Sequence, residues 1–200
     1  MLFRSSTGPT GSTGATGSTG AIGNGTIIPY ASASPITVSN VIGGALGASG
    51  LVGFGSSIDN ISRDFIPGGS VIILTVVEGT PNWNFAYSMP RDGTITSLAA
   101  YFSIAEQIDL TGSTVTIQAE VFTSATPNDT FVSEATGIVF LAPALTGLTT
   151  SGTICHGIVT GLNIPVTAET RILIAFTATA NISAPRNFIS GYASAGLAID

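Results

Sequence analysis

The sequence predicts an all-β fold of the jelly-roll sandwich type, and three observations support this prediction. After residue 27, short apolar runs alternate with polar residues at a period of two, which is typical of half-buried strands. Gly, Pro, Asn and Asp residues separate these runs and supply turns. No segment has the length and the amphipathic period of an ordinary helix. About ten antiparallel strands in such a chain favour two packed sheets.

The first residues follow a different pattern, in which glycine recurs at every third position. These glycines are Gly8, Gly11, Gly14, Gly17, Gly20 and Gly23. A Gly-X-Y register is what a collagen triple helix needs, because only glycine fits where three chains meet at the axis. We therefore expect an N-terminal tail at residues 1–26, with a collagen-like stub at 8–25, and a homotrimeric protein. Residues 27–200 would form the globular head that trimerises.

The stub itself is a poor triple-helix former, since Pro9 is its only imino acid. We expect it to be disordered on its own, and a flexible Gly/Ser/Thr linker is the alternative interpretation. Threonine fills four Y positions of the stub. Their hydroxyls are candidates for O-glycosylation: Thr10, Thr13, Thr16 and Thr19.

The clearest strand is Ser113–Thr123, where Val115 and Val121 would point to the core. Thr114, Thr116, Gln118 and Glu120 would point to water. Asp92-Gly93 and Thr111-Gly112 supply turns between strands. The other expected strands are, in chain order, Ile27–Ala31, Ile36–Val38, Leu51–Phe54, Ser70–Val77, Asn82–Ser88, Thr94–Ile104, Phe131–Leu141, Thr153–Val159, Arg171–Ala180 and Asn187–Ile199.

The composition is poor in charge and rich in apolar residues, with 8% charged residues and a mean hydropathy of +0.52. Some apolar surface should therefore be buried between subunits, and the run Gly191–Ile199 would lie in the core or along the three-fold contact. The net charge is −6, with five arginines and no lysine, which argues against nucleic-acid binding. The absence of lysine also excludes a lysine Schiff base and a P-loop.

No catalytic constellation is apparent in the sequence, and we expect no enzymatic activity and no cofactor. Cys155 and His156 are the only thiol and the only imidazole, and they are adjacent on an expected strand. Neighbouring side chains of a strand point to opposite faces, which disfavours a Cys-His dyad. His156 would share its face with Ile154 and Ile158, as a packed or interface residue.

Metal binding is disfavoured for similar reasons. One histidine and one cysteine cannot build a transition-metal site, and three His156 side chains around a trimer axis are the one arrangement left open. The carboxylates are scattered without a calcium-loop spacing. We expect Asp59, Asp64, Glu106 and Asp109 to be solvated surface residues.

Two segments bear on targeting. Met1–Thr7 contains no apolar core of a secretory signal. The longest apolar stretch, Val41–Gly55, is too short to span a bilayer and is better explained as glycine-rich turns between buried strands.

Several strings of the head resemble a known family. They are IIPYASASP from Ile27, LVGFGSS from Leu51, SMPRDGTITSLAAYFS from Ser88, GLNIPVTAETRILIAFTATA from Gly161 and GYASAGLAI from Gly191. Together they resemble the C-terminal domain of BclB-type exosporium glycoproteins of spore-forming bacteria. The resemblance implies a trimeric head with a complement- and tumour-necrosis-factor-like jelly roll that caps a collagen-like stalk at the spore surface.

The expected function is therefore structural, in adhesion or surface contact by a fibre in the exosporium or at the tip of a spore appendage. Its partners would be two further copies of the chain and a spore anchor protein. One alternative is a recognition module that binds a glycan or a protein, for which Trp83, tyrosines or arginines in a cleft would be evidence. Another alternative is the head of a phage-type tail fibre.

Overall fold

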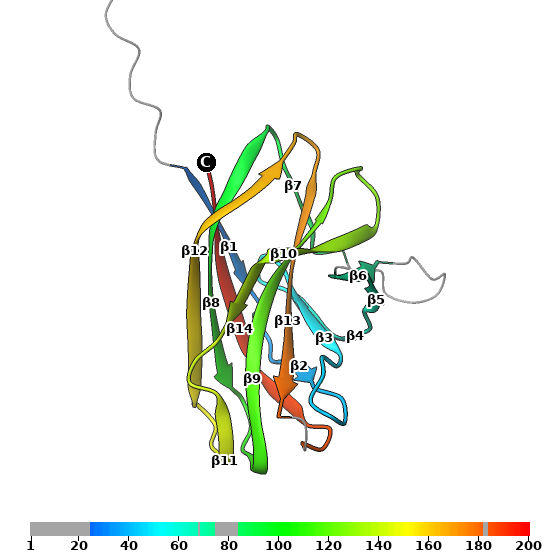
Figure 1. Ribbon diagram of the computed structural model, residues 1–200. Coiled ribbons are helices and arrows are strands. Elements are labelled where there is room, and N and C mark those ends of the chain that lie inside the picture. Colours follow the sequence, from blue (N-terminus) through cyan, green and yellow to red (C-terminus); the bar gives the residue numbers. More distant parts are fainter. Residues whose placement is uncertain (1–24, 68, 75–83, 182–183) are drawn as a thin grey trace, which may run out of the picture.

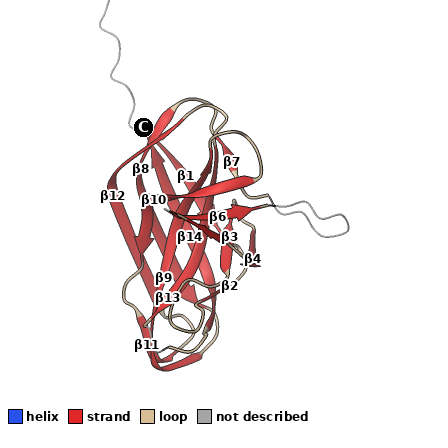
Figure 2. Ribbon diagram, turned by 45° about the vertical axis from the view of Figure 1, so that its right-hand side comes forward, coloured by secondary structure: helices blue, strands red, loops and turns tan. Residues whose placement is uncertain are grey.

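The computed structural model describes residues 25–67, 69–74, 84–181 and 184–200. Within these residues the chain is all-β, with two curled antiparallel sheets packed face to face and no helix (Figures 1 and 2). The predicted fold class is thus confirmed, and the arrangement is consistent with a jelly-roll sandwich. The collagen-like stub and the four threonines proposed for O-glycosylation lie outside the described residues.

The smaller sheet contains strands from both ends of the described chain. Its order is β1 (Thr26–Ala31), β14 (Phe188–Ile199), β8 (Gly93–Ile104) and β12 (Ile154–Val166), and β2 (Ile36–Ser39) also pairs with β14. All of these pairings are antiparallel.

The larger sheet forms the other layer. Its order is β4 (Ser57–Ile61), β3 (Ser49–Val52), β13 (Arg171–Ala180), β9 (Ile108–Ser124), β10 (Thr130–Phe140), β6 (Gly69–Ile73) and β5 (Asp64–Ile66). Two short strands are attached to it: β11 (Leu145–Thr149) pairs with β9, and β7 (Tyr87–Ser88) pairs with β13.

The main hydrophobic core lies between the two sheets and follows the alternation expected from the sequence. On β8, Leu98 and Phe102 face inward, and Val115 and Val121 on β9 do the same. The rings of Phe102 and Phe176 approach to 6.3 Å between centroids. Alternating apolar residues therefore produce the sandwich, as predicted, because each sheet buries one apolar face against the other.

Most expected strands are present, with some corrections. The strand expected at Thr153–Val159 continues to Val166, and only Tyr87–Ser88 of the segment expected at 82–88 is a described strand. Strands β4, β5 and β11 were not predicted. Thr111-Gly112 does not separate two strands: Gly112 has a φ of 82° and lies inside β9, where the pairing with β11 is irregular.

The glycine-rich segment Val41–Gly55 forms turns around the short strand β3, as the sequence indicated. Gly44 has a φ of 83°, and a Cβ atom there would lie 2.1 Å from the carbonyl oxygen of Ala180. Glycine is needed at this position because both the backbone angle and the close approach exclude a side chain.

The outer face of the larger sheet carries a second, smaller core. Leu51, Phe122 and Leu173 point outward from the sheet and pack under residues of β6 and β10 such as Ile72 and Phe131. The central strands β9 and β13 are therefore buried on both faces over part of their length.

This second layer corrects the expectation that Gln118 and Glu120 face water. They do point away from the main core, but the segment from β4 to β6 covers this face, and both side chains are buried. Thr114, on the same strand, is exposed as predicted. Periodicity indicated the face correctly, whereas its coverage depends on a segment that is distant in the sequence.

A buried ion pair joins the covering segment to the sheet. Arg63, between β4 and β5, donates from Nη1 to Oε2 of Glu120 at 2.6 Å, and both side chains are almost inaccessible to solvent. Nε and Nη2 of Arg63 donate to Oγ of Ser49, and Nη1 also reaches Oγ of Ser70 at 3.3 Å. The guanidinium lies 5.3 Å from the ring centre of Phe122. One arginine thereby connects β3, β6 and β9.

Replacing Arg63 by methionine should lower the free energy of unfolding by about 3–5 kcal/mol, because it leaves the carboxylate of Glu120 buried without a counter-charge. The measurement is urea unfolding at a fixed protein concentration. The matched control is Arg91→Met, since Arg91 is exposed and donates only to a neighbouring backbone carbonyl. The Arg63→Met/Glu120→Leu double variant should regain part of the loss. Equal effects of Arg63→Met and Arg91→Met would contradict a structural role for the ion pair.

Candidate functional site

The outer face of the smaller sheet differs from the rest of the molecule in its lack of charge. The five strands of this sheet contain no Asp, Glu, Lys or Arg residue. The strands of the larger sheet, in contrast, include Asp59, Asp64, Asp109, Glu134 and Arg171. A sheet face in contact with water normally carries charged and polar residues, so an uncharged face indicates contact with another surface.

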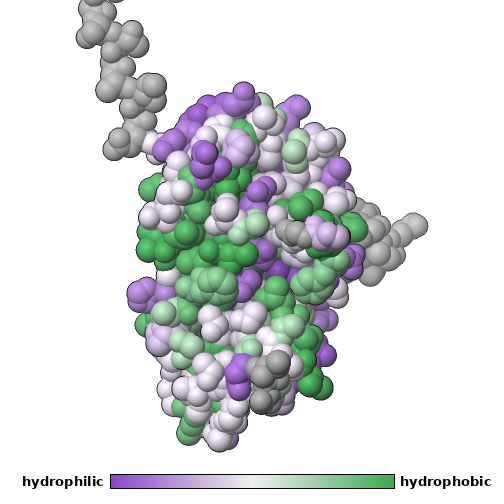
Figure 3. All heavy atoms as spheres, viewed as in Figure 1, coloured by the Kyte–Doolittle hydropathy of each residue, from purple (hydrophilic) through white to green (hydrophobic). Residues whose placement is uncertain are grey.

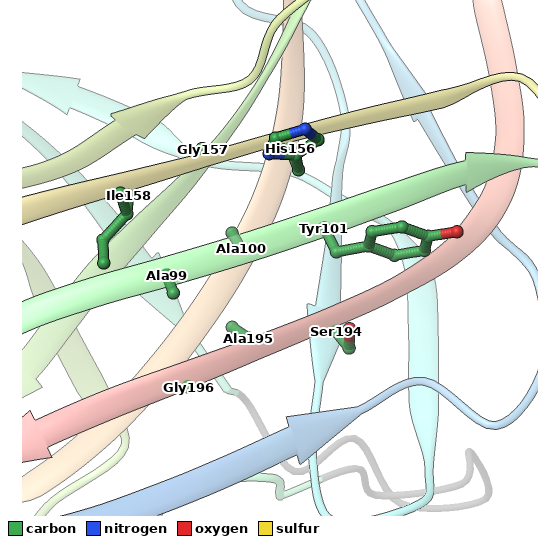
Figure 4. Close-up of a pocket in the computed structure, with 9 residues that line it drawn as sticks. All are labelled: Ala99, Ala100, Tyr101, His156, Gly157, Ile158, Ser194, Ala195 and Gly196. Carbon is green, nitrogen blue, oxygen red and sulfur yellow. The ribbon is translucent and has the colours of Figure 1, made fainter.

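The strand register arranges the outward side chains of this face in rows. His156, Tyr101, Ser194 and Ala31 form one row across β12, β8, β14 and β1. Figure 4 shows the first three strands side by side with these side chains on them. In this row the side chains on β14 and β1 are small, whereas those on β12 and β8 are large.

The next two rows cross the same four strands. Ile158, Ala99, Gly196 and Pro29 form one of them, followed by Thr160, Ser97, Ala198 and Ile27. We call these three rows, from β12 to β1, the uncharged face.

Large side chains border the small ones and leave a shallow depression of about 360 Å³ between them. Ile158 is 66% exposed on one side of the depression, and Tyr101 lines it. Ile27 on β1, and Tyr192 of β14 next to the first row, add further exposed apolar surface. The space-filling view shows hydrophobic side chains gathered over β12 and its neighbours (Figure 3).

The edges of the smaller sheet are partly closed to strand addition. His156 exchanges two backbone hydrogen bonds with Ala142, each 2.9 Å long, beside the outer edge of β12. On the opposite side, Ala31 of β1 bridges to Phe54. Contact with another molecule is therefore favoured on the face of the sheet over its edges.

Cys155 and His156 lie on opposite faces of β12, as the sequence predicted. Cys155 is buried in the main core, and its Sγ contacts the backbone oxygen of Phe102 at 3.8 Å. Burial raises the pKa of the Cys155 thiol to about 11. His156 is exposed on the uncharged face. The two groups cannot act as a nucleophile and its base within one chain.

The remaining candidate residues are dispersed. Within the described ranges, no three His, Cys, Asp or Glu side chains meet as a metal site. Asp64, Glu106 and Asp109 are exposed. The half-buried Asp59 accepts a hydrogen bond from the backbone nitrogen of Thr37 at 3.0 Å, so it is only partly solvated.

Two further expectations concern segments of the chain. Trp83 lies outside the described residues. Among the described residues, no helix has the length and hydrophobicity needed to cross a bilayer.

The run Gly191–Ile199, which was expected in the core or along a three-fold contact, has one face in the core and the other on the surface. Ala193, Ala195, Leu197 and Ile199 point into the core, which confirms that part of the prediction. The outward residues of the same strand belong to the uncharged face or border it. The face as a whole was missed in the sequence, although its signal was present: residues 93–104, 154–166 and 188–199 all lack charge.

The Cys155 thiol should be unreactive in the folded protein. A thiol-specific aromatic disulfide at pH 8 should label Cys155 only after unfolding in denaturant. The pKa of the Cys155 thiol is about 11 in the folded state, above the ordinary value of 9.0, so the thiol stays protonated to a higher pH when the chain is folded. The free energy of unfolding should therefore fall as pH rises from about 9 to 11, and the Cys155→Ala variant should lack this component. Equally fast labelling with and without denaturant would contradict the burial of the thiol.

Comparison with known proteins identifies a relative in sequence. No family model matches the chain. "Collagen-like protein 1" of Acanthamoeba polyphaga mimivirus is 33% identical over 182 residues, which cover 88% of this chain and 19% of that protein. A solved structure of the infectious bursal disease virus Gx strain is 11% identical and covers 82% of this chain and 40% of that one, but its TM-score of 0.21 is too low to relate the folds. The chain is thus similar, over most of its own length, to about a fifth of a collagen-like protein.

Proposed function

We propose that this chain is a structural protein whose head forms a homotrimer through the uncharged face and caps a collagen-like fibre. The observation that carries the proposal is the uncharged face itself, with its exposed Ile27, Tyr101 and Ile158 side chains. Burial of such side chains contributes roughly 25 cal/mol for each Å² removed from water. No charge on the strands would have to be desolvated when the faces meet.

The position of the tail supports three copies in particular. The Gly-X-Y register of residues 8–25 requires three chains in parallel. Strand β1 begins at Thr26, which pairs with Ile199 at one end of the uncharged face. If three such faces pack around one axis, the three points where tail and head join lie together. The head would then keep the three stubs in register, which their low proline content does not do alone.

The biological setting that we propose is the surface of bacterial spores, in the exosporium or on a spore appendage. This rests on the resemblance of the head to BclB-type domains, and the related collagen-like protein supports the coarser statement of a fibre-associated head. A spore anchor protein would be the second partner. The chain would act in adhesion or surface contact and have no enzymatic role.

A viral fibre is the second candidate, and the source of the related protein favours it. The same trimeric head would then lie on a fibre of a virus particle. The physical role of the uncharged face is identical in both settings, so the two candidates differ in location only.

Antibodies raised against the head should label the outer surface of intact spores of the organism that carries the gene, in immunogold electron microscopy. A strain lacking the gene provides the control. Labelling confined to virus particles would support the second candidate, and labelling confined to the cell interior would contradict both.

The purified chain should have a mass in solution of about 60 kDa, three times the 20.1 kDa of one chain, by light scattering coupled to size exclusion. Deletion of residues 1–25 should leave a trimer, because the head supplies the buried area. Ile158→Glu should dissociate the trimer, since it places a charge in the apolar contact. A monomeric wild-type chain would contradict the proposal.

The matched control for this substitution is Leu148→Glu. Leu148 on β11 is 64% exposed, close to the 66% of Ile158, but it lies outside the uncharged face. It should leave the mass unchanged. Equal dissociation by both variants would show that added charge alone, and not its position, weakens the assembly.

A further inference from the structure

A second depression lies on the other side of the molecule, on the outer face of the larger sheet. It has a volume of about 250 Å³, between β9 and β10 on one side and the β5–β6 hairpin on the other. Gln118, Glu120, Ser70, Ser133, Phe65 and Leu46 contribute to its lining. We call it the Gln118 pocket. Its volume is slightly below the roughly 300–1,000 Å³ of drug-sized ligand sites, so it suits one small ring.

Three polar side chains of this pocket are buried, and two of them, Glu120 and Ser70, are held by hydrogen bonds before any ligand arrives. Gln118 is 4% exposed, Glu120 3% and Ser70 3%. Arg63 holds Oε2 of Glu120 at 2.6 Å, and the backbone nitrogen of Ser70 donates to Oγ of Ser133 at 2.9 Å. A site whose groups are held by other contacts loses little conformational freedom on binding.

Several hydrogen-bonding positions remain unused at the pocket. The side-chain amide of Gln118 has no hydrogen-bond partner among the described residues, although the residue is buried. Within the same described part, Oε1 of Glu120 is also without a partner, and the hydroxyls of Ser70 and Ser133 act only as acceptors. In the described ranges, the buried side-chain atoms without a partner are those of Tyr30 and Thr177 and not those of Gln118, so the Gln118 amide is reached by solvent through the pocket. A ligand with donors and acceptors can take the place of that solvent at the amide.

The charge and the apolar part of the lining narrow the chemistry of the ligand. Glu120 is the one carboxylate in the lining, and the guanidinium of Arg63 offsets it. The pocket therefore favours neither a cationic nor an anionic ligand. Phe65 lines the pocket with 64% of its surface exposed, which provides an accessible aromatic surface for a flat apolar ligand face.

We propose that the Gln118 pocket binds one neutral pyranose ring of a glycan. A pyranose has hydroxyl groups that both donate and accept, which suits Gln118, the two serines and the free oxygen of Glu120. It also has a face of C–H groups, which would pack on Phe65. The pocket lies within one chain and away from the uncharged face, so this inference holds independently of the trimer.

The test uses saturation-transfer NMR of the full chain with the methyl glycosides of glucose, galactose, mannose and N-acetylglucosamine, followed by titration of those that bind. At least one should receive saturation. Phe65→Ala and Gln118→Leu should each weaken its binding by about tenfold, because they remove the apolar surface and the amide, respectively. Phe65 is exposed, so its substitution should leave the fold intact.

The matched control is Phe140→Ala, since Phe140 is 61% exposed on β10 and does not line the pocket. It should bind as the wild-type chain does, and so should the Ile158→Glu variant, whatever its mass. The proposal is overturned if no glycoside receives saturation at about 20 mM, a concentration that detects weak single-ring binding. It is also overturned if both pocket variants bind unchanged.

Discussion

The buried contact between Arg63 and Glu120 determines how the outer half of the molecule is built. It fixes the turn between β4 and β5 against β9, and the same guanidinium holds Ser49 of β3 and Ser70 of β6. The second core around Phe122 and the Gln118 pocket both lie beneath or beside this segment. A buried ion pair is a weak source of net stability, but it tolerates few alternative arrangements, because any other position leaves a charge unpaired.

The two sheets use their outer faces in different ways. The larger sheet covers part of its face with its own chain, which makes an internal second core and leaves charged residues near the surface. The smaller sheet has no such cover within the described chain, and its strands carry no Asp, Glu, Lys or Arg residue. An uncovered face of this kind keeps apolar surface in water, which is unfavourable for an isolated chain. The proposed trimer removes that cost.

The tail and the head depend on each other in this proposal. A Gly-X-Y stub with one proline gains little from its own sequence, since collagen stability depends on proline-rich triplets. Bringing three tails together at the start of β1 raises the effective concentration of the stubs, because they then associate within one assembly and no longer as separate chains.

The sequence by itself determined the fold class, most strands and the separation of Cys155 from His156. These follow from local alternation, because a strand places successive side chains on opposite faces wherever it lies. Strands β4, β5 and β11 were missed because their pairing partners, and not their own propensities, fix them. Tertiary structure alone decided that Glu120 is buried against Arg63, and that uncharged strands from residues 26–31, 93–104, 154–166 and 188–199 form one face. Both depend on pairing between distant segments, which no local pattern specifies.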